Sequence, residues 1–144
     1  MKVKIVNKSN NDLPNYSTEH AAGMDLRAYI NEPIVLGSLE RVMVHTGLYV
    51  ELPVGYEAQV RPRSGMAIKH GITVINTPGT IDADYRGEIC ALIVNLSKDE
   101  FTINSGDRIC QMVIGKHDTV QWNLVDELEE TVRGKGGFGH TGKK

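Results

Sequence analysis

Short apolar blocks separated by close turn signals are the feature that most restricts the fold of this 144-residue chain. Apolar residues alternate with polar ones or run in short stretches, a pattern typical of strands. The blocks are KVKIV, PIVL, RVMVHTGLYVEL, GYEAQVR, ITVI, EICALIVN, EFTI, RICQMVI and VQWNLV. Turn signals such as LPVG, NTPG, LSKDE and NSGD lie too close together for crossover helices between successive strands. The pattern predicts an all-β domain, either a sandwich, a jelly roll or a barrel.

Three segments depart from this pattern. SGMAIKHG at 64–71 has a serine before a short run and a glycine after it, which predicts one or two helical turns capped by these two residues. DELEETVRG at 126–134 is acidic and predicts a solvated connector. The final segment, RGKGGFGHTGKK, has five glycines in twelve residues, which disfavours helix and strand. We therefore expect one domain over 1–132 and a mobile C-terminal arm over 133–144.

Charge and hydropathy exclude several classes of protein. The formal net charge of −2 argues against a general nucleic-acid binder, because affinity for phosphate backbones comes from clustered Lys and Arg. No run approaches the roughly 18–20 apolar residues that cross a bilayer. The segment MKVKIVNKSN also lacks the apolar region of a signal peptide. We expect a cytoplasmic protein with no nucleic-acid or membrane partner.

The two cysteines, Cys90 and Cys110, each lie inside an apolar run. This position favours reduced thiols in the core over a disulfide framework. None of the five histidines is paired with another His or Cys at the spacing of zinc ligands. We therefore do not expect a structural zinc site.

The C-terminal segment contains two formal phosphate-binding signatures without their structural context. GKGGFG matches GxGxxG, but that fingerprint requires a strand before it and a helix after it. GFGHTGK matches GxxxxGK, but Lys144 replaces the required Ser or Thr. The glycine amides, Arg133 and the ring of Phe138 could nevertheless wrap phosphates and stack on a base. A solubilising tail is the alternative on composition alone.

The segment VRPRSGMA at 60–67 predicts an anion-binding position. Arg63 and Ser64 fall at the expected junction between a strand and a helical turn. Free amides at a helix start and a forked guanidinium both bind anions. The alternative is an arginine that is only solvated at the end of a strand.

The segment NTPGTIDADYRGEI at 76–89 contains the strongest candidates for catalysis. Asn76 and the following Pro-Gly predict a hairpin with exposed backbone. In an extended chain, Asp82 and Asp84 point the same way, and like charges so close raise the pKa of one of them. Such a carboxylate could be a general base or a metal ligand. A plain turn is the alternative.

Together these residues resemble the trimeric deoxyuridine triphosphate nucleotidohydrolase (dUTPase) family. Five segments match in the order of the family and span nearly the whole chain: AGMDLRA at 22–28, RPRSGMA at 61–67, GTIDADYRGEI at 79–89, GDRICQMVI at 106–114 and RGKGGFGHTG at 133–142. The resemblance implies a jelly-roll or β-clip type barrel with one short helix and a flexible C-terminal arm. It also implies a homotrimer with shared active sites at subunit boundaries.

The implied activity is Mg²⁺-dependent hydrolysis of dUTP to dUMP and pyrophosphate by attack of water on the α-phosphorus. Such a dUTP diphosphatase limits uracil in DNA and supplies dUMP for thymidylate synthesis. By resemblance, Asp82 is the general base, and Asp84 is structural.

The resemblance assigns further residues to substrate. Asn76 and the main chain of the following turn would read uracil, and the ring of Tyr85 would pack on the sugar and exclude a 2′-hydroxyl. The turn residues that match this part of the motif are Gly79, Thr80 and Ile81. A site built for the N3–H donor and O4 acceptor of uracil leaves polar groups unpaired against cytosine, which costs about 1–3 kcal/mol for each group.

The phosphates would be bound by other motifs. Arg63, Ser64 and Gly65 match the phosphate-binding part of the second motif, and Gln111 matches the glutamine of the fourth. Asp25 matches the aspartate near the metal, which it would contact through water because Mg²⁺ keeps several waters.

The arm would close over the active site of a neighbouring subunit. Phe138 would stack on uracil and Arg133 would reach the γ-phosphate, with Gly139 and His140 beside them. Many members of the family have serine where this chain has His140. A protonated imidazole donates better to phosphate, so we expect closure to tighten below about pH 6.5.

Two other functions are weighed against this one. A deoxycytidine triphosphate deaminase shares the fold but removes ammonia from the base, and the arm with its phenylalanine favours the phosphohydrolase. A non-catalytic jelly-roll binding module is the second alternative, against which Asp82 and Tyr85 are intact.

Overall fold

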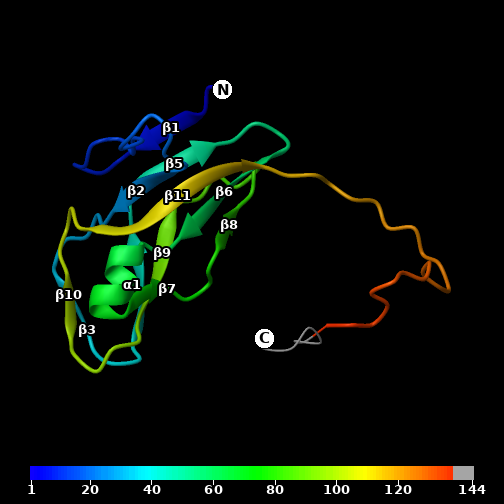
Figure 1. Ribbon diagram of the computed structural model, residues 1–144. Helices are drawn as coiled ribbons and strands as arrows, with labels where there is room; N and C mark the ends of the chain where they lie inside the picture. The colour runs from blue at the N-terminus through cyan, green and yellow to red at the C-terminus, as the bar shows by residue number, and fades with distance from the viewer. Residues whose placement is uncertain (138–144) are drawn as a thin grey trace.

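The structure is a computed structural model that describes residues 1–137 of the chain. Within these residues the chain forms short strands and one helix (Figure 1). The elements are β1 Lys4–Asn7, β2 Gly23–Arg27, β3 Ile34–Leu36, β4 Arg41–His45, β5 Leu48–Glu51, β6 Tyr56–Arg61, α1 Ser64–His70, β7 Ile72–Val74, β8 Gly79–Ile81, β9 Cys90–Asn95, β10 Phe101–Ile103 and β11 Arg108–Lys116.

The strands form an antiparallel, jelly-roll type arrangement. The largest sheet has the order β2-β11-β6-β8, and a second has the order β4-β9-β7. Two further pairs, β1-β5 and β10-β3, extend the body. Figure 1 shows β2, β11 and β6 side by side, with α1 beside the β7 end of the second sheet. The predicted all-β class is confirmed.

The core lies between the two larger sheets. Leu26 of β2 and Val60 of β6 face Val44 of β4 and Ile93 of β9, and all four are buried. Leu92, next to Ile93 on the same strand, is exposed, as the two-residue period of a strand requires. Fully burying one such side chain contributes about 1.5–3 kcal/mol, which favours the register that points Ile93 inward.

The apolar blocks predict most strands, but they miss β2 and β8, and two of the blocks differ from the structure. The block RVMVHTGLYVEL divides into β4 and β5 at Gly47, whose φ of 71° favours glycine. A side chain there would also meet the backbone nitrogen of Ser9 at 2.8 Å. The predicted strand VQWNLV is wrong, because residues 120–125 are exposed and pair with no strand in the described part of the chain. Its apolar residues do not face the core of their own domain.

The predicted helix is present, but its first cap differs. Arg63, with an extended backbone, is the N-cap, and no side chain caps the helix there. The serine predicted as the cap is instead the first helical residue, Ser64. Gly71 ends the helix in the left-handed region, at φ 66° and ψ 18°, as predicted.

The predicted hairpin around Pro78 is a crossing between sheets. Strand β7 pairs with β9, whereas β8 pairs with β6, so the two strands that flank this turn are not partners in the described sheets. The hairpin prediction is therefore wrong in its pairing. The turn motif correctly marks a reversal but contains no information about which strand is the partner.

The cysteines are free thiols, as predicted. Cys110 is buried in the core, but Cys90 is only partly buried, so the core prediction is correct for one of the two. Burial and the charge of Glu88 raise the pKa of the Cys90 thiol. Cys90 misses the core because it shares a face of β9 with the exposed Leu92.

Beyond β11 the chain leaves the body of the domain as an extended segment (Figure 1). Residues 126–134 are exposed throughout, which confirms the predicted solvated connector. In the described residues the helix is seven residues long, and we find no helix with the length and apolarity to cross a bilayer.

Candidate active site

A cluster of polar side chains forms where β2, β11 and the end of β6 meet. Asp25 on β2 and Gln111 on β11 are cross-strand partners, and Gln111 is also opposite Arg61 on β6. Arg63, two residues farther along, donates from Nε to Asp25 Oδ1 at 2.9 Å. The three motifs that contain Asp25, Arg63 and Gln111 are thus joined at one end of the sheet, as the resemblance implies.

Arg108 is a member of this cluster that the sequence analysis did not single out. Its Nη1 lies 3.4 Å from Asp25 Oδ2, and its carbonyl oxygen accepts from Arg63 Nη1 at 2.9 Å. Both oxygens of the Asp25 carboxylate therefore face guanidinium groups. The signal was available, because Arg108 precedes Gln111 by three residues within the same motif.

The cluster presents hydrogen-bond donors toward solvent. Ser64 and Gly65 are exposed in the first turn of α1, and apart from its chain neighbours and the backbone of its own helix, no atom of residues 1–137 lies within 4 Å of the Cβ position of Gly65. Gln111 is held by a bond from its Nε2 to the carbonyl of Pro62 at 3.0 Å. Two guanidinium groups beside a hydroxyl and an amide suit an anionic ligand with several oxygens.

Cys110 lies under this cluster and does not share its chemistry. Burial, together with the negative charge of Asp25, raises the pKa of Cys110 to about 12. The thiol is therefore protonated near neutral pH, and it is a packing residue.

The segment from Asn76 to Ile81 has both an exposed and a buried part. Asn76 and Thr80 are exposed, whereas Gly79 is buried against β6. A Cβ on Gly79 would lie 3.1 Å from Asn76 Nδ2, which places the Asn76 amide directly over this glycine. The arrangement holds the Asn76 amide over Gly79, next to the exposed Thr80.

Tyr85 folds over Gly87. A Cβ on Gly87 would lie 2.2 Å from Tyr85 Oη, so only glycine leaves room for the ring in this position. Tyr85 Oη donates to the carbonyl of Glu88 at 3.1 Å, and Tyr85 N donates to the carbonyl of Asp82 at 3.1 Å. The ring is therefore held just after Asp82, with 44% of the residue exposed.

Asp82 and the cation cluster lie at opposite ends of β6. Ile81 is paired with Ala58, and the two strands are antiparallel, so the chain after Ile81 runs toward the start of β6 and places Asp82 there. Arg63 instead lies two residues beyond the end of β6. At about 3.3 Å per residue, the two positions are separated by roughly 20 Å. Within residues 1–137, no hydrogen bond or ion pair engages the exposed Asp82 carboxylate.

The predicted residues of the C-terminal arm are only partly described. Arg133 is exposed and lies in a turn, where its Nε donates to the carbonyl of Gly136 at 2.9 Å. Phe138, Gly139 and His140 lie outside the described residues.

The fold and these groups fit one class: an all-β protein with a cationic site suited to a phosphorylated ligand. The dUTPase family model matches residues 9–142. A deoxyuridine 5'-triphosphate nucleotidohydrolase of Finegoldia magna is 60% identical over 142 residues, covering 99% of both chains. One from Cytophaga hutchinsonii is 63% identical and covers 98% of this chain and 92% of that protein.

Solved structures agree with these relatives. A Staphylococcus bacteriophage 80alpha dUTPase mutant with dUpNHpp matches with a TM-score of 0.87 and 25% identity, covering 98% of both chains. This chain belongs to the dUTPase family, and the recognition made from its five motifs is confirmed.

Proposed function

We propose that this protein hydrolyses dUTP to dUMP and pyrophosphate, with Asp82 as the general base for a water that attacks the α-phosphorus. The relatives in the family are named for this substrate, and the phage enzyme was solved with dUpNHpp. The observation that most supports the chemistry is the exposed Asp82 carboxylate, which no other described side chain engages. Proton removal by a positioned base accelerates such reactions by about 10²–10⁴.

Binding of the triphosphate is assigned to the cluster at the end of β6. Arg63 and Arg108 are held by Asp25, and Ser64, Gly65 and Gln111 lie beside them. Charge-assisted hydrogen bonds of this kind are about twice as strong as neutral ones. This cluster would hold the leaving pyrophosphate while the α-phosphorus faces the base.

Recognition of the nucleoside is assigned to β8 and the residues that flank it, which lie alongside β6. The Asn76 amide and the main chain of Gly79, Thr80 and Ile81 would pair with the edge of uracil, as the family resemblance implies. The ring of Tyr85 would pack against the deoxyribose. The bond from Tyr85 Oη to the carbonyl of Glu88 supports this role because it holds the ring in one orientation.

A metal ion would enter with the substrate. Both Asp25 oxygens already face arginines, so Asp25 fits an outer contact through water better than direct coordination. Mg²⁺ suits this arrangement, because it keeps several waters and binds phosphate oxygens. When bound, Mg²⁺ would neutralise charge on the triphosphate.

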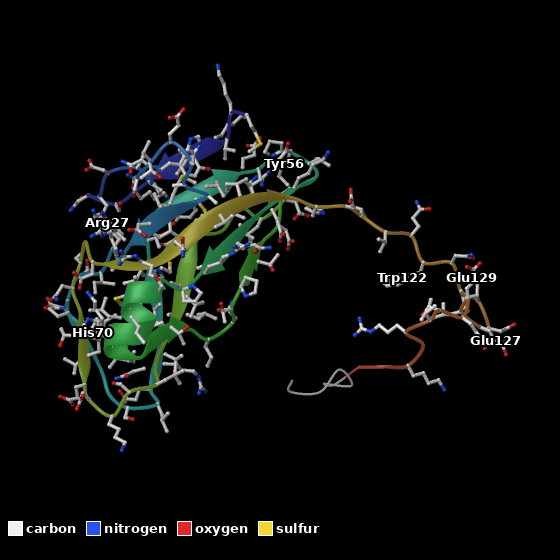
Figure 2. All side chains as sticks on the ribbon, viewed as in Figure 1. Arg27, Tyr56, His70, Trp122, Glu127 and Glu129 are labelled. Atoms are coloured by element: carbon white, nitrogen blue, oxygen red, sulfur yellow. The ribbon has the colours of Figure 1, made fainter. Side chains whose placement is uncertain are left out.

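A complete site requires more than one copy of the chain. The base and the phosphate cluster are separated by roughly 20 Å along β6, which exceeds the distance from the α-phosphorus to its own leaving group. A second feature supports assembly: the exposed segment after β11 contains Trp122, which is 94% exposed, and Leu124, which is 98% exposed. In Figure 2 Trp122 lies clear of the sheets.

We therefore propose a homotrimer with shared sites. Asp82 of one subunit would face Arg63 of another, and the segment with Trp122 would pack on a neighbour. The arm from Arg133 onward, including Phe138, Gly139 and His140, would then close over the nucleotide. Free thiols at Cys90 and Cys110, together with a soluble nucleotide as substrate, support a cytoplasmic location.

A complementation experiment tests function and sharing together. Asp82→Asn and Arg63→Ala proteins are each expected to be nearly inactive on dUTP with Mg²⁺. The two variants are then refolded together in equal amounts. A shared site is intact when one subunit supplies Asp82 and its neighbour supplies Arg63, and each condition has a probability of about one half. About a quarter of wild-type pyrophosphate release should therefore return. If hybrid trimers form without recovery, the shared site is wrong. If the wild-type protein releases no pyrophosphate from dUTP but releases ammonia from dCTP, the hydrolase assignment is wrong.

A further inference from the structure

His45, Glu88 and Cys90 form a cluster of potential metal ligands that the proposed hydrolysis does not use. His45 ends β4 and Cys90 begins β9, and the two residues are directly opposite each other in the antiparallel register. Glu88 precedes Cys90 by two residues and lies on the same side. An imidazole, a carboxylate and a thiol, the ligand types that zinc prefers, therefore meet at the end of two paired strands.

The distances between the ligand atoms suit one cation. Cys90 Sγ lies 3.6 Å from His45 Nδ1, and His45 Nδ1 lies 2.9 Å from Glu88 Oε2. All three ligand atoms lie within 4.8 Å of one another. Zinc bonds of about 2.0–2.1 Å to nitrogen and about 2.3 Å to sulfur place tetrahedral N and S ligands about 3.6 Å apart. The distance between the Glu88 carboxylate oxygen and the His45 nitrogen needs to increase by only about 0.5 Å for the ion to bind between them.

The carboxylate is already oriented for this role. Glu88 Oε1 accepts from the backbone nitrogens of Thr46 at 3.1 Å and Gly47 at 2.7 Å. These two bonds occupy one oxygen and direct the other, Oε2, toward His45. Hydrogen bonds that fix a metal ligand in this way are typical outer-shell support in protein metal sites.

The backbone that holds the ligands is fixed as well. Ile89 N donates to the carbonyl of Leu48 at 2.8 Å, and Thr46 Oγ1 donates to the carbonyl of Ile89. These bonds tie the segment 45–48 to the segment 88–90 on both sides of the cluster. Ligands on paired strands keep their geometry better than ligands on loops.

The cluster is also open to an ion from solvent. The side chains of His45 and Glu88 are 48% and 21% exposed, and Cys90 is partly buried. Three protein ligands leave one tetrahedral position for water. We propose that His45 Nδ1, Glu88 Oε2 and Cys90 Sγ bind one Zn²⁺ ion per chain, which clamps the ends of β4 and β9 together.

This site is separate in chemistry from the Mg²⁺ that would accompany the nucleotide. A thiolate and an imidazole select zinc and similar ions, whereas Mg²⁺ prefers carboxylate, water and phosphate oxygens. Physiological Mg²⁺ should therefore leave the cluster untouched. The proposal departs from the sequence prediction of no zinc site, because that prediction considered spacing along the chain and not pairing across strands.

Cobalt is a suitable probe, because Co²⁺ takes zinc sites and its bond to a thiolate gives a near-ultraviolet charge-transfer band. We expect full-length, metal-free protein to develop this band at one equivalent of Co²⁺ per chain and to lose it when Zn²⁺ is added. Excess Mg²⁺ should have no effect. Cys90→Ser should abolish the band, and His45→Gln should weaken binding by about a hundredfold or more, beyond the loss typical of an outer-shell change.

His117→Gln is the matched control, because His117 is an exposed histidine just beyond β11 and far along the chain from the cluster. Far-ultraviolet circular dichroism and dUTP turnover should confirm that all three variants are folded. Zn²⁺ should also raise the Tm of the wild type and of His117→Gln, but not of Cys90→Ser. Absence of the thiolate band in the wild type, or its persistence in Cys90→Ser, would overturn the site and leave a hydrogen-bonded cluster only.

Discussion

The Asp25 carboxylate lies 2.9 Å from Arg63 Nε, across the junction of β2 and the segment that follows β6. This ion pair holds the guanidinium of Arg63 beside the exposed Ser64, and Arg108 contacts the other Asp25 oxygen at 3.4 Å. Asp25 thus contacts both arginines of the proposed phosphate site, one through each carboxylate oxygen.

We expect Asp25→Asn to lower kcat/KM for dUTP by about 10–100-fold, because a hydrogen bond to a charged group contributes about 1.5–3 kcal/mol. Steady-state kinetics at fixed Mg²⁺ measures this loss. Asp118→Asn, which removes an exposed aspartate beyond β11, is the control and should behave as the wild type. An Asp25→Asn enzyme with unchanged kcat/KM would show that Arg63 needs no anchor.

Asp82→Asn should retain affinity for dUTP while kcat falls by about 10²–10⁴, because the amide cannot accept the proton from water. Asp84→Asn provides a closely matched control, since it removes the same charge two residues away. It should retain kcat close to that of the wild type. Single-turnover kinetics and equilibrium binding of dUpNHpp separate the two effects. Equal losses in both variants would point to the local charge and not to a base.

The contrast between Asp82 and the cation cluster shows what could be predicted from sequence. The motifs select candidate side chains by residue type, because the chemistry of a carboxylate or a guanidinium is local. Their separation along β6 depends on the register of Ile81 with Ala58, which is a long-range pairing. The sequence of the turn at Pro78 does not specify that β8 pairs with β6 while β7 pairs with β9. The pattern therefore predicts strands better than it predicts their partners.

The sequence predicts less well which apolar blocks are buried within the domain. The block VQWNLV has the composition of a strand, yet Trp122 and Leu124 are almost fully exposed in a single chain. Composition reports that a residue prefers to be buried but not whether its own domain or another chain buries it. Likewise the role of Gly87 becomes apparent only when the ring of Tyr85 is seen against it.

Gly87 controls the position of Tyr85, so a larger side chain there should alter sugar selectivity. In Gly87→Ala the new methyl group would overlap Tyr85 Oη, which lies 2.2 Å from the Cβ position, and the ring must move. We expect the ratio of kcat/KM for dUTP over UTP to fall by about tenfold or more, within the range that one misplaced contact costs. Gly115→Ala is the control, because apart from the two chain neighbours no described atom lies within 4 Å of the Cβ position of Gly115. An unchanged ratio in Gly87→Ala would remove Tyr85 from sugar recognition.

The exposed segment after β11 should stabilise the proposed trimer. Leu124→Ala combined with Trp122→Ala removes two large apolar side chains that the isolated domain leaves in water. Because burying such side chains contributes about 1.5–3 kcal/mol each, the double variant should dissociate at higher protein concentration than the wild type. Light scattering across a dilution series measures this shift. Gln121→Ala and Asn123→Ala on the same segment are controls, and a double variant as stable as these would place the interface elsewhere.

The buried Cys110 thiol should make the protein less stable in alkali. Burial, with a further contribution from Asp25, raises the pKa of Cys110 from the ordinary thiol value of 9.0 to about 12. Above pH 9 the unfolded chain loses this proton while the folded chain keeps it. The stabilisation is therefore complete below pH 9 and is lost as the pH rises toward 12, with a slope of at most about 1.4 kcal/mol per pH unit.

In Cys110→Ala the titrating group is gone, and the free energy of unfolding should fall less steeply over this range. Urea unfolding at pH 8, 9, 10 and 11 for both proteins provides the comparison. The cavity left by the smaller side chain lowers the curve of the variant by a constant amount, which does not affect its slope. Parallel curves for the two proteins would mean that the Cys110 proton is not held more tightly in the folded state than in the unfolded chain.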